Sequence, residues 1–345
     1  MQLGFFDMEN RLGRLSEMGD ALERINPIID WEIFRPIIEH ALQEARGKAK
    51  GPGGRPAFDC ILMFKILFLQ RLYHLSDDQT EYQINDRLSF MRFLGLGLGD
   101  KVPDAKTIWL FKDTLSKAGV MRQLFDRFGE LLEDAHLITK TGTIVDATFV
   151  DAPRQRNTRE ENKTIKEGGV PEEWQTEEMC HKLAQKGTDA RWAKKNNEVH
   201  YGYKDHVKAD AESKLITDYA VTSANVHDSQ ALASLISDDD QVLYADSAYS
   251  GKELLAALPE SVEIKVLEKG TRNHPLTSEQ KASNKEKSKI RVRIEHIFGF
   301  MTISMHGITL KSIGRVRAEF QIGLTNLIYN ICRFETLSRL KRAVE

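Results

Sequence analysis

Apolar residues recur at helical spacing through the first part of the chain. Residues 1–50 show the pattern of amphipathic helices, and the run at 58–75 is apolar on nearly every face, which predicts a buried helix. Ser76 and Gln79 form a capping-box signal for the helix that follows. The pattern therefore predicts an all-α N-terminal domain over residues 1–137.

At residue 141 the pattern changes from helical spacing to alternation, which is typical of a strand. In the segment TGTIVDATFV, the side chains of Val145, Ala147 and Phe149 share one face and Asp146 lies on the other. Two strands joined by a turn are expected within 200–224, and further strands are expected near 241–246 and 262–268. Later helices are expected around RVRIEHIFGF and over about 316–337.

This order of elements predicts an α/β fold for residues 138–345. Three antiparallel strands followed by parallel strands with crossover helices form a mixed sheet with helices on its faces. The polar segment at about 153–198 is dense in charges of both signs, so we expect it to be an inserted, mobile segment.

Composition and charge narrow the class of protein. A chain of 345 residues suggests two domains, and no apolar stretch approaches the ~18 residues that span a membrane. The N-terminus lacks the pattern of a secretory signal, and the three cysteines suggest neither a disulfide framework nor a zinc pattern, so a reducing cytoplasm is expected. The net charge is only −2, but the stretch from Lys269 to Arg293 has eight Lys or Arg residues against two Glu.

Three acids stand in apolar surroundings: Asp146 in the middle of a strand, Asp246 at the end of a strand, and Glu295 on a helix. Functional groups gather at the carboxyl ends of central strands in open α/β sheets. Clustered carboxylates repel one another unless a cation lies between them, and Mg²⁺ prefers oxygen ligands. Two such ions ~4 Å apart can drive phosphoryl transfer. A lone Asp more often forms a turn or a cap, and Asp151 is a rival for the first position.

Arg291 lies one helical turn before Glu295, on the same face. Arg before Glu is the poorer order for a stabilising helix pair. An Arg beside a catalytic acid is better explained as holding a phosphate, which its planar fork suits. Arg293 and the lysines before it would extend that contact along a DNA backbone.

These residues resemble the DDE triad of bacterial insertion-sequence transposases, with Asp146 in DAT, Asp246 in ADSAYSG and Glu295 in R-x-x-x-E. The chain is similar to the insertion sequence five family in particular. The helical segment that begins GRPAFDC, the segment DARWAKKNNEVHYGYKDHVKAD and the segment TSANVHDSQAL also agree with that family. The similarity covers most of residues 50–335.

The resemblance implies a ribonuclease-H-like catalytic domain, preceded by a helical domain that binds DNA or dimerises. It implies DNA transposition with two Mg²⁺ ions, which Mn²⁺ may replace. Water would cleave a phosphodiester at the terminal inverted repeat, and the freed 3′-hydroxyl would attack target DNA. Asp146 and Asp246 would bridge the metals, and Glu295 would complete the second metal site.

The implied partners are double-stranded DNA, as inverted repeats and as target, and further copies of the chain. Paired ends require a homodimer or a larger assembly on DNA, in the cytoplasm of a bacterium at its nucleoid and without a membrane. Many relatives have a tyrosine three residues before the arginine and a lysine seven after the glutamate. Ser288 and Thr302 replace them here, which puts in doubt a hairpin intermediate that relies on those two residues.

Several further residues are candidates for contact with DNA or for the surroundings of the metals. The DNA-binding candidates are Arg191, Trp192, Lys194, Lys195, Lys204, Arg291 and Arg293. Trp192 could stack on a base or anchor the insertion to the sheet. Lys204 could reach a phosphate or be an ordinary edge-strand lysine. His227 and Asp228 could support the metals, although Asp228 could simply cap a helix. Arg55 could enter a minor groove or belong to a plain linker.

Two other functions compete with transposition. A domesticated or inactive relative would bind DNA in a sequence-specific way without cutting it. A structure-selective nuclease on the same fold would cut DNA without strand transfer. The three acids argue against the first, because a protein that only binds DNA has no use for apolar-flanked carboxylates. Terminal inverted repeats beside the gene would favour transposition over a structure-selective nuclease.

Overall fold

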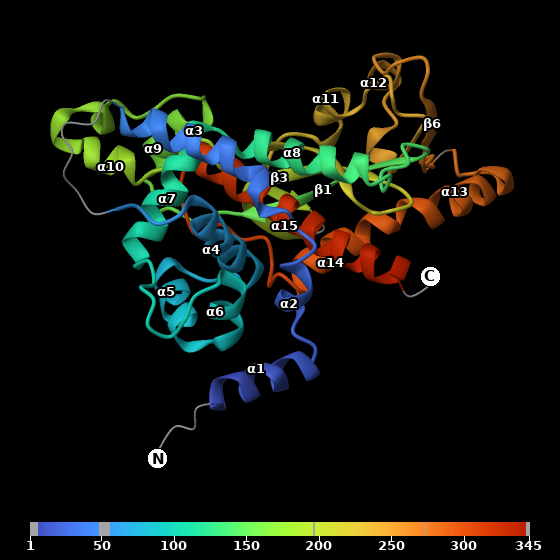
Figure 1. Ribbon diagram of the computed structural model, residues 1–345. Helices are drawn as coiled ribbons and strands as arrows, with labels where there is room; N and C mark the ends of the chain where they lie inside the picture. Colours follow the sequence, from blue (N-terminus) through green and yellow to red (C-terminus); the bar gives the residue numbers. More distant parts are fainter. Residues whose placement is uncertain (1–5, 48–55, 196, 273, 343–345) are drawn as a thin grey trace. The chain divides into compact units, whose positions relative to one another are not determined.

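The computed structural model describes residues 6–47, 56–195, 197–272 and 274–342 (Figure 1). The chain forms two compact units: unit 1 comprises Met1–Phe128 and Leu327–Glu345, and unit 2 comprises Gly129–Asn326. The division thus falls at Phe128 instead of residue 137, and the end of the chain joins unit 1. Arg55, the candidate for a minor-groove contact or a plain linker, lies outside the described residues.

Unit 1 is helical, as the sequence predicts. Its elements are α1 (Asp7–Glu17), α2 (Ala21–Ile25), the 3-10 helix η1 (Trp31–Phe34), α3 (Arg35–Arg46), α4 (Cys60–Leu72), α5 (Asp77–Asp86), α6 (Leu88–Leu94) and α7 (Ala105–Ala118). Two further helices, α8 (Met121–Asp134) and α15 (Arg315–Arg342), each belong partly to unit 1 and partly to unit 2. The expected capping box starts α5, where Ser76 Oγ accepts from the Gln79 N–H at 3.2 Å and Gln79 Oε1 accepts from the Ser76 N–H at 3.1 Å.

Helix α4 is the centre of the unit 1 core and is buried around most of its circumference, as its continuous apolar run predicts. Its two phenylalanines pack against rings from η1 and α6, with ring centroids 4.9–6.4 Å apart. The rings of this cluster are Trp31, Phe34, Phe64, Phe68 and Phe93. Aromatic pairs in such tilted and edge-on geometries stabilise a core beyond the area that they bury.

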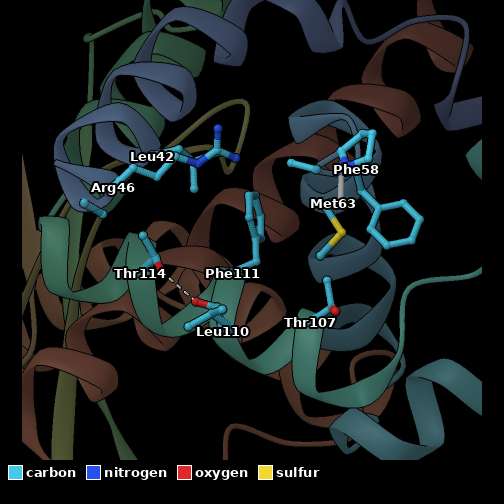
Figure 2. A pocket seen from close by; sticks show the side chains of 11 residues that line it. Leu42, Arg46, Phe58, Met63, Thr107, Leu110, Phe111 and Thr114 are labelled. Atoms are coloured by element: carbon cyan, nitrogen blue, oxygen red, sulfur yellow. Dashed lines mark hydrogen bonds between the residues drawn. The ribbon is translucent and has the colours of Figure 1, made fainter. Parts of the chain in front are cut away.

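A cavity of about 420 Å³ lies between α3, the start of α4 and α7 (Figure 2). Its walls are mainly apolar, and Leu42, Met63 and Phe111 contribute to them. Among the described residues that line the cavity, Arg46 is the only charged one.

Unit 2 is built on a six-stranded mixed sheet. The strands are β1 (Thr143–Asp151), β2 (Arg191–Lys195), β3 (Glu198–Asp210), β4 (Ile216–Ser223), β5 (Val242–Ala245) and β6 (Glu263–Val266). Through the main part of the sheet the order is β4-β3-β1-β5-β6, and β2 pairs with the first residues of β3. The pairs β4–β3 and β3–β1 are antiparallel, whereas β1–β5 and β5–β6 are parallel. This is the mixed sheet that the sequence predicts, and its strand order agrees with the ribonuclease-H-like fold that the family resemblance implies.

Helices lie between the strands of unit 2 and after the last strand (Figure 1). They are α9 (Arg159–Lys166), η2 (Glu172–Gln175), η3 (Glu177–Met179), α10 (Cys180–Ala184), η4 (Asp228–Ala231), α11 (Leu232–Leu235), η5 (Ser247–Tyr249), α12 (Lys252–Ala256), α13 (Ser278–Arg291) and α14 (Arg293–Ile303). One apolar cluster joins the sheet to α11 and η5 and includes Val145, Leu232, Leu243 and Tyr249. This cluster holds the ends of β1 and β5 in fixed positions.

The charged insertion forms helices and a strand of its own. It carries α9, η2, η3, α10 and β2, and the ring of Trp174 is fully buried. The Trp174 indole N–H donates to Glu161 Oε1 at 2.9 Å, and Lys182 Nζ donates to the same oxygen at 2.8 Å. The insertion therefore has an apolar centre of its own, with a carboxylate that satisfies two donors.

The segment RVRIEHIFGF also differs from the single long helix expected for it. Helix α13 ends at Arg291 and α14 begins at Arg293, with Val292 between them. The break places Arg291 and Glu295 on two different helices.

None of the described helices is both long and apolar enough to cross a bilayer.

Candidate active site

Asp146 lies in the middle of β1 and is largely buried. Its Oδ1 accepts from the Ala147 N–H at 2.8 Å, and its Oδ2 accepts from Arg291 Nη1 at 3.1 Å. Burial raises the pKa of the Asp146 carboxyl, and the charge of Asp246 raises it further, whereas the backbone bond, Arg291 and Lys195 lower it. Because the net effect is a rise in pKa, the Asp146 carboxyl ionises less readily than a free one. A further cation beside it would favour the ionised form.

Asp246 directly follows β5, which pairs with β1 in parallel. The register joins Ile144 to Tyr244, so Asp146 and Asp246 each stand two residues beyond the same pair. Asp246 Oδ1 accepts from the Ala248 N–H at 2.7 Å and caps η5. The capping role that competes with a catalytic role is therefore present, and among the described residues the second carboxylate oxygen of Asp246 has no hydrogen-bond partner.

Glu295 lies in the first turn of α14, and 54% of its side chain is exposed. Its Oε1 accepts from Arg291 Nη2 at 2.6 Å. Because the other guanidinium nitrogen Nη1 bonds Asp146, Arg291 joins two of the three acids. The Nε of Arg291 is buried and has no hydrogen-bond partner within the described residues.

The donor set suits a divalent cation in its chemistry. Carboxylate oxygens are the ligands that Mg²⁺ prefers, and one or two of them with a substrate phosphate are enough to hold it. In the part of the chain that the structure describes, no three His, Cys, Asp or Glu side chains gather closely enough to ligate one ion. Arg291 supplies the positive charge between Asp146 and Glu295 in this arrangement.

Tyr249 is a neighbour of the acids that the sequence reasoning did not single out. Its side chain is buried, and its hydroxyl has no hydrogen-bond partner within the described residues. Burial raises the pKa of the Tyr249 hydroxyl, and the charges of Asp146, Asp228 and Asp246 raise it further. Tyr249 follows Asp246 by three residues in ADSAYSG, which is the one signal that could have identified it.

Asp151, the rival acid, ends β1 and does not join the other three. Its Oδ1 lies 3.3 Å from His200 Nδ1, and 52% of its side chain is exposed. The ring of His200 stacks on Phe149 at 4.2 Å. Asp151 therefore belongs to a separate contact at the end of the strand.

Of the four candidates on β2, Arg191 is partly buried and the other three are exposed. The Arg191 guanidinium donates to backbone carbonyls of Ile165, Thr188 and Ala190. Lys194 and Lys195 are exposed, and the charge of Lys195 lowers the pKa of Asp146. The Trp192 ring is 52% exposed and lies 5.4 Å from the Arg154 guanidinium carbon.

The remaining candidates make contacts within unit 2. Lys204 Nζ donates to Asp228 Oδ1 at 2.6 Å and to the Val226 carbonyl at 2.7 Å. His227, and not Asp228, caps η4, because its ring nitrogen accepts from the Ser229 N–H. Arg293 Nη1 donates to the Ala211 carbonyl at 2.7 Å and thereby holds the start of α14 to the turn after β3.

Comparison with known proteins places these observations in a family. Residues 138–331 match the family model described as the transposase DDE domain. Residues 10–114 match a second family model, described as a transposase domain. A cryo-EM structure of the piggyBac transposase synaptic complex with hairpin DNA matches 92% of this chain and 76% of that chain, with 10% identity and a TM-score of 0.49. At this identity and TM-score, nothing about the chemistry of this chain follows from that likeness.

Proposed function

This chain belongs to the DDE transposases of the bacterial insertion-sequence type, and from that premise we propose that Asp146, Asp246 and Glu295 are its catalytic acids. The protein is a DNA transposase, and DNA is its substrate. The parallel register of β1 and β5 supports the assignment, because it sets Asp246 beside Asp146 on neighbouring strands. Arg291, which bonds both Asp146 and Glu295, connects the third acid to the first. Regulatory DNA binding without cleavage is not favoured.

The acids would hold divalent ions, Mg²⁺ or Mn²⁺, through their carboxylate oxygens. Such ions lower the pKa of bound water and stabilise the leaving oxygen during displacement at phosphorus. Asp146 lies on the central strand β1 and Asp246 directly follows β5, so the sheet would hold both acids in place when DNA binds. Glu295 is half-exposed on a helix and can adjust its side chain toward the same site.

We assign the reaction as cleavage at the terminal inverted repeats of an insertion sequence, followed by attack of the freed 3′-hydroxyl on target DNA. Arg291 and the exposed pair Lys194 and Lys195 would hold the phosphates that flank the scissile bond. Arg191, Lys204 and Arg293 already donate hydrogen bonds within unit 2. They would therefore stabilise the structure around the site and would not contact DNA.

Strand cleavage tests this assignment directly. Labelled duplex from the DNA flanking the gene would be incubated with the protein and Mg²⁺ or Mn²⁺, next to Asp246→Asn and the exposed control Asp238→Asn. We expect the unaltered protein and the control to cut at a terminal repeat, and Asp246→Asn to bind without cutting. Tight binding without cleavage by the unaltered protein under both metals would instead indicate a relative that only binds DNA.

We further propose that the protein acts on DNA as a homodimer or a larger assembly, because transposition must hold two ends together. Light scattering of the protein with and without a terminal-repeat duplex would give the mass of each species. A complex of two chains with two duplexes supports the proposal. Cleavage by one chain on one duplex, with no joining of the product to a target, would favour a simple nuclease.

A further inference from the structure

Arg291 occupies an unusual position among the acids. It is the last residue of α13, one residue before the break at Val292, and its side chain is 20% exposed. Nη1 lies 3.1 Å from Asp146 Oδ2, and Nη2 lies 2.6 Å from Glu295 Oε1. One guanidinium thus donates to an oxygen of each of two acids, and Asp146 lies 145 residues before Arg291 in the sequence.

A divalent ion held by the same carboxylates would lie close to the guanidinium and repel it, so each cation weakens the binding of the other. The acids need positive charge between them whether or not a metal is present, since Asp246 adds a further negative charge beside Asp146. Arg291 supplies this charge in the present arrangement. Each cation is therefore a competitor of the other.

We infer that Arg291 is an exchangeable counter-ion of the active site, which neutralises Asp146 and Glu295 in the DNA-free protein and leaves them when a divalent ion binds. The freed guanidinium then turns to a phosphate of the DNA, whose oxygens suit its planar fork. This inference rests on the proposed role of the three acids. Binding of the ion by the acids and binding of a phosphate by Arg291 would then occur in one step.

Three features separate this arrangement from a permanent structural ion pair. The Arg291 Nε is buried without a partner within the described residues, so the guanidinium is not fully satisfied where it lies. The Glu295 side chain is 54% exposed, so its ion pair with Arg291 is open to solvent and contributes little. No side chain of α13 is fully buried, so its last turn can shift at little cost in apolar packing.

The test measures Mn²⁺ binding to the full-length, DNA-free protein through the electron paramagnetic resonance signal of free Mn²⁺. The variants are Arg291→Ala, Arg291→Gln and Arg291→Lys. Lys289→Ala, which removes an exposed positive charge from the same turn of α13, is the matched control. Asp246→Asn reports whether the ion binds at the acids at all.

We expect Arg291→Ala and Arg291→Gln to bind Mn²⁺ about tenfold more tightly, the factor that one charge-assisted hydrogen bond typically represents. Arg291→Lys should stay near the unaltered protein because it keeps the competing charge, and Lys289→Ala should not change the affinity. The same Arg291→Ala protein should bind a terminal-repeat duplex more weakly in the presence of Mn²⁺. A merely structural role for Arg291 would not move the two affinities in opposite directions.

Two kinds of failure can be told apart. If Mn²⁺ binding survives in Asp246→Asn, the ion binds elsewhere and the proposed site itself fails. If binding is lost in Asp246→Asn but Arg291→Ala and Arg291→Gln bind Mn²⁺ equally or more weakly than the unaltered protein, the exchange at Arg291 is overturned and the proposed site stands. A thermal unfolding curve for each variant confirms that it is folded, and Arg291→Gln serves if Arg291→Ala is not.

Discussion

The carboxylate of Asp205 and the side-chain amide of Asn326 face each other inside unit 2. Asn326 Nδ2 donates to Asp205 Oδ1 at 3.1 Å, and both groups are fully buried. Asp205 Oδ2 and Asn326 Oδ1 have no partner within the described residues. A proton on Oδ2 would let it donate to Asn326 Oδ1 and close a ring of two hydrogen bonds. Burial raises the pKa of Asp205 to about 7, which favours this protonated form.

We therefore predict that Asp205 makes the protein less stable as the pH rises from about 4 to 7. The folded state retains the Asp205 proton in this range and the unfolded state releases it, so this group lowers the free energy of unfolding by up to about 1.4 kcal/mol per pH unit. Asp205→Asn, which keeps the paired amide geometry without a charge, should remove this dependence. Urea unfolding at several pH values measures it.

The exposed Asp238→Asn is the control for that experiment and should follow the pH dependence of the unaltered protein. Asp205→Asn should be the more stable protein at pH 8. If its stability instead falls in parallel with that of the unaltered protein between pH 4 and 7, Asp205 is ionised in the folded state throughout this range.

The second prediction concerns the hydroxyl of Tyr249, which is buried near three carboxylates and has no hydrogen-bond partner among the residues that the structure describes. A buried hydroxyl with no hydrogen bond costs stability, so Tyr249→Phe should raise the free energy of unfolding by about 1 kcal/mol. Tyr244→Phe is the control, because the Tyr244 hydroxyl interacts with Lys265 and its removal should bring no gain. A loss of stability in Tyr249→Phe would show that its hydroxyl has a partner.

The third prediction concerns Gly202, where β3 passes closest to β1. A Cβ at this position would lie 2.2 Å from the Val150 carbonyl oxygen and 2.8 Å from the Ala152 nitrogen, and the φ angle is +154°. Gly202→Ala should therefore destabilise unit 2 severely, by on the order of 4 kcal/mol, and reduce the yield of soluble protein.

Gly299→Ala is the matched control for Gly202→Ala. Gly299 lies inside α14, and nothing stands within 4 Å of a Cβ built there. Alanine is the better helix former, so this change should raise the free energy of unfolding by about 0.5–1 kcal/mol. Equal melting temperatures for the two variants would contradict the close approach of β3 to β1.

The fourth prediction separates the two kinds of basic residue on β2. Lys194 is exposed, so Lys194→Ala should weaken DNA binding and reduce the salt dependence of the binding constant by about one charge. The guanidinium of Arg191 donates to backbone carbonyls, so Arg191→Ala should instead lower the free energy of unfolding by about 1–3 kcal/mol. Affinities at several salt concentrations, with melting curves, measure both. A salt dependence lowered only by Arg191→Ala would reverse the assignment.

Local patterns determined the elements of this fold. The apolar run of α4, the capping box of Ser76 and Gln79 and the alternation around Asp146 each predict their element, because helical and strand periodicity are properties of neighbouring residues. The order of strands also predicts the mixed sheet, since few topologies accommodate it. The sequence alone therefore predicts the strand or helix on which, or at the end of which, each of the three acids lies.

Only the tertiary structure decided which groups those acids meet. Arg291 bonds Asp146 as well as the nearby Glu295, and Lys204 and Arg293 are engaged by Asp228 and by the Ala211 carbonyl. The break of the helix at Val292 and the division of α8 and α15 between two units have no local signal either. Contacts between residues far apart in the chain depend on the register of strands and the packing of helices. A side chain's partners are therefore settled only when these distant elements come together, whereas its own strand or helix can be predicted from its neighbours.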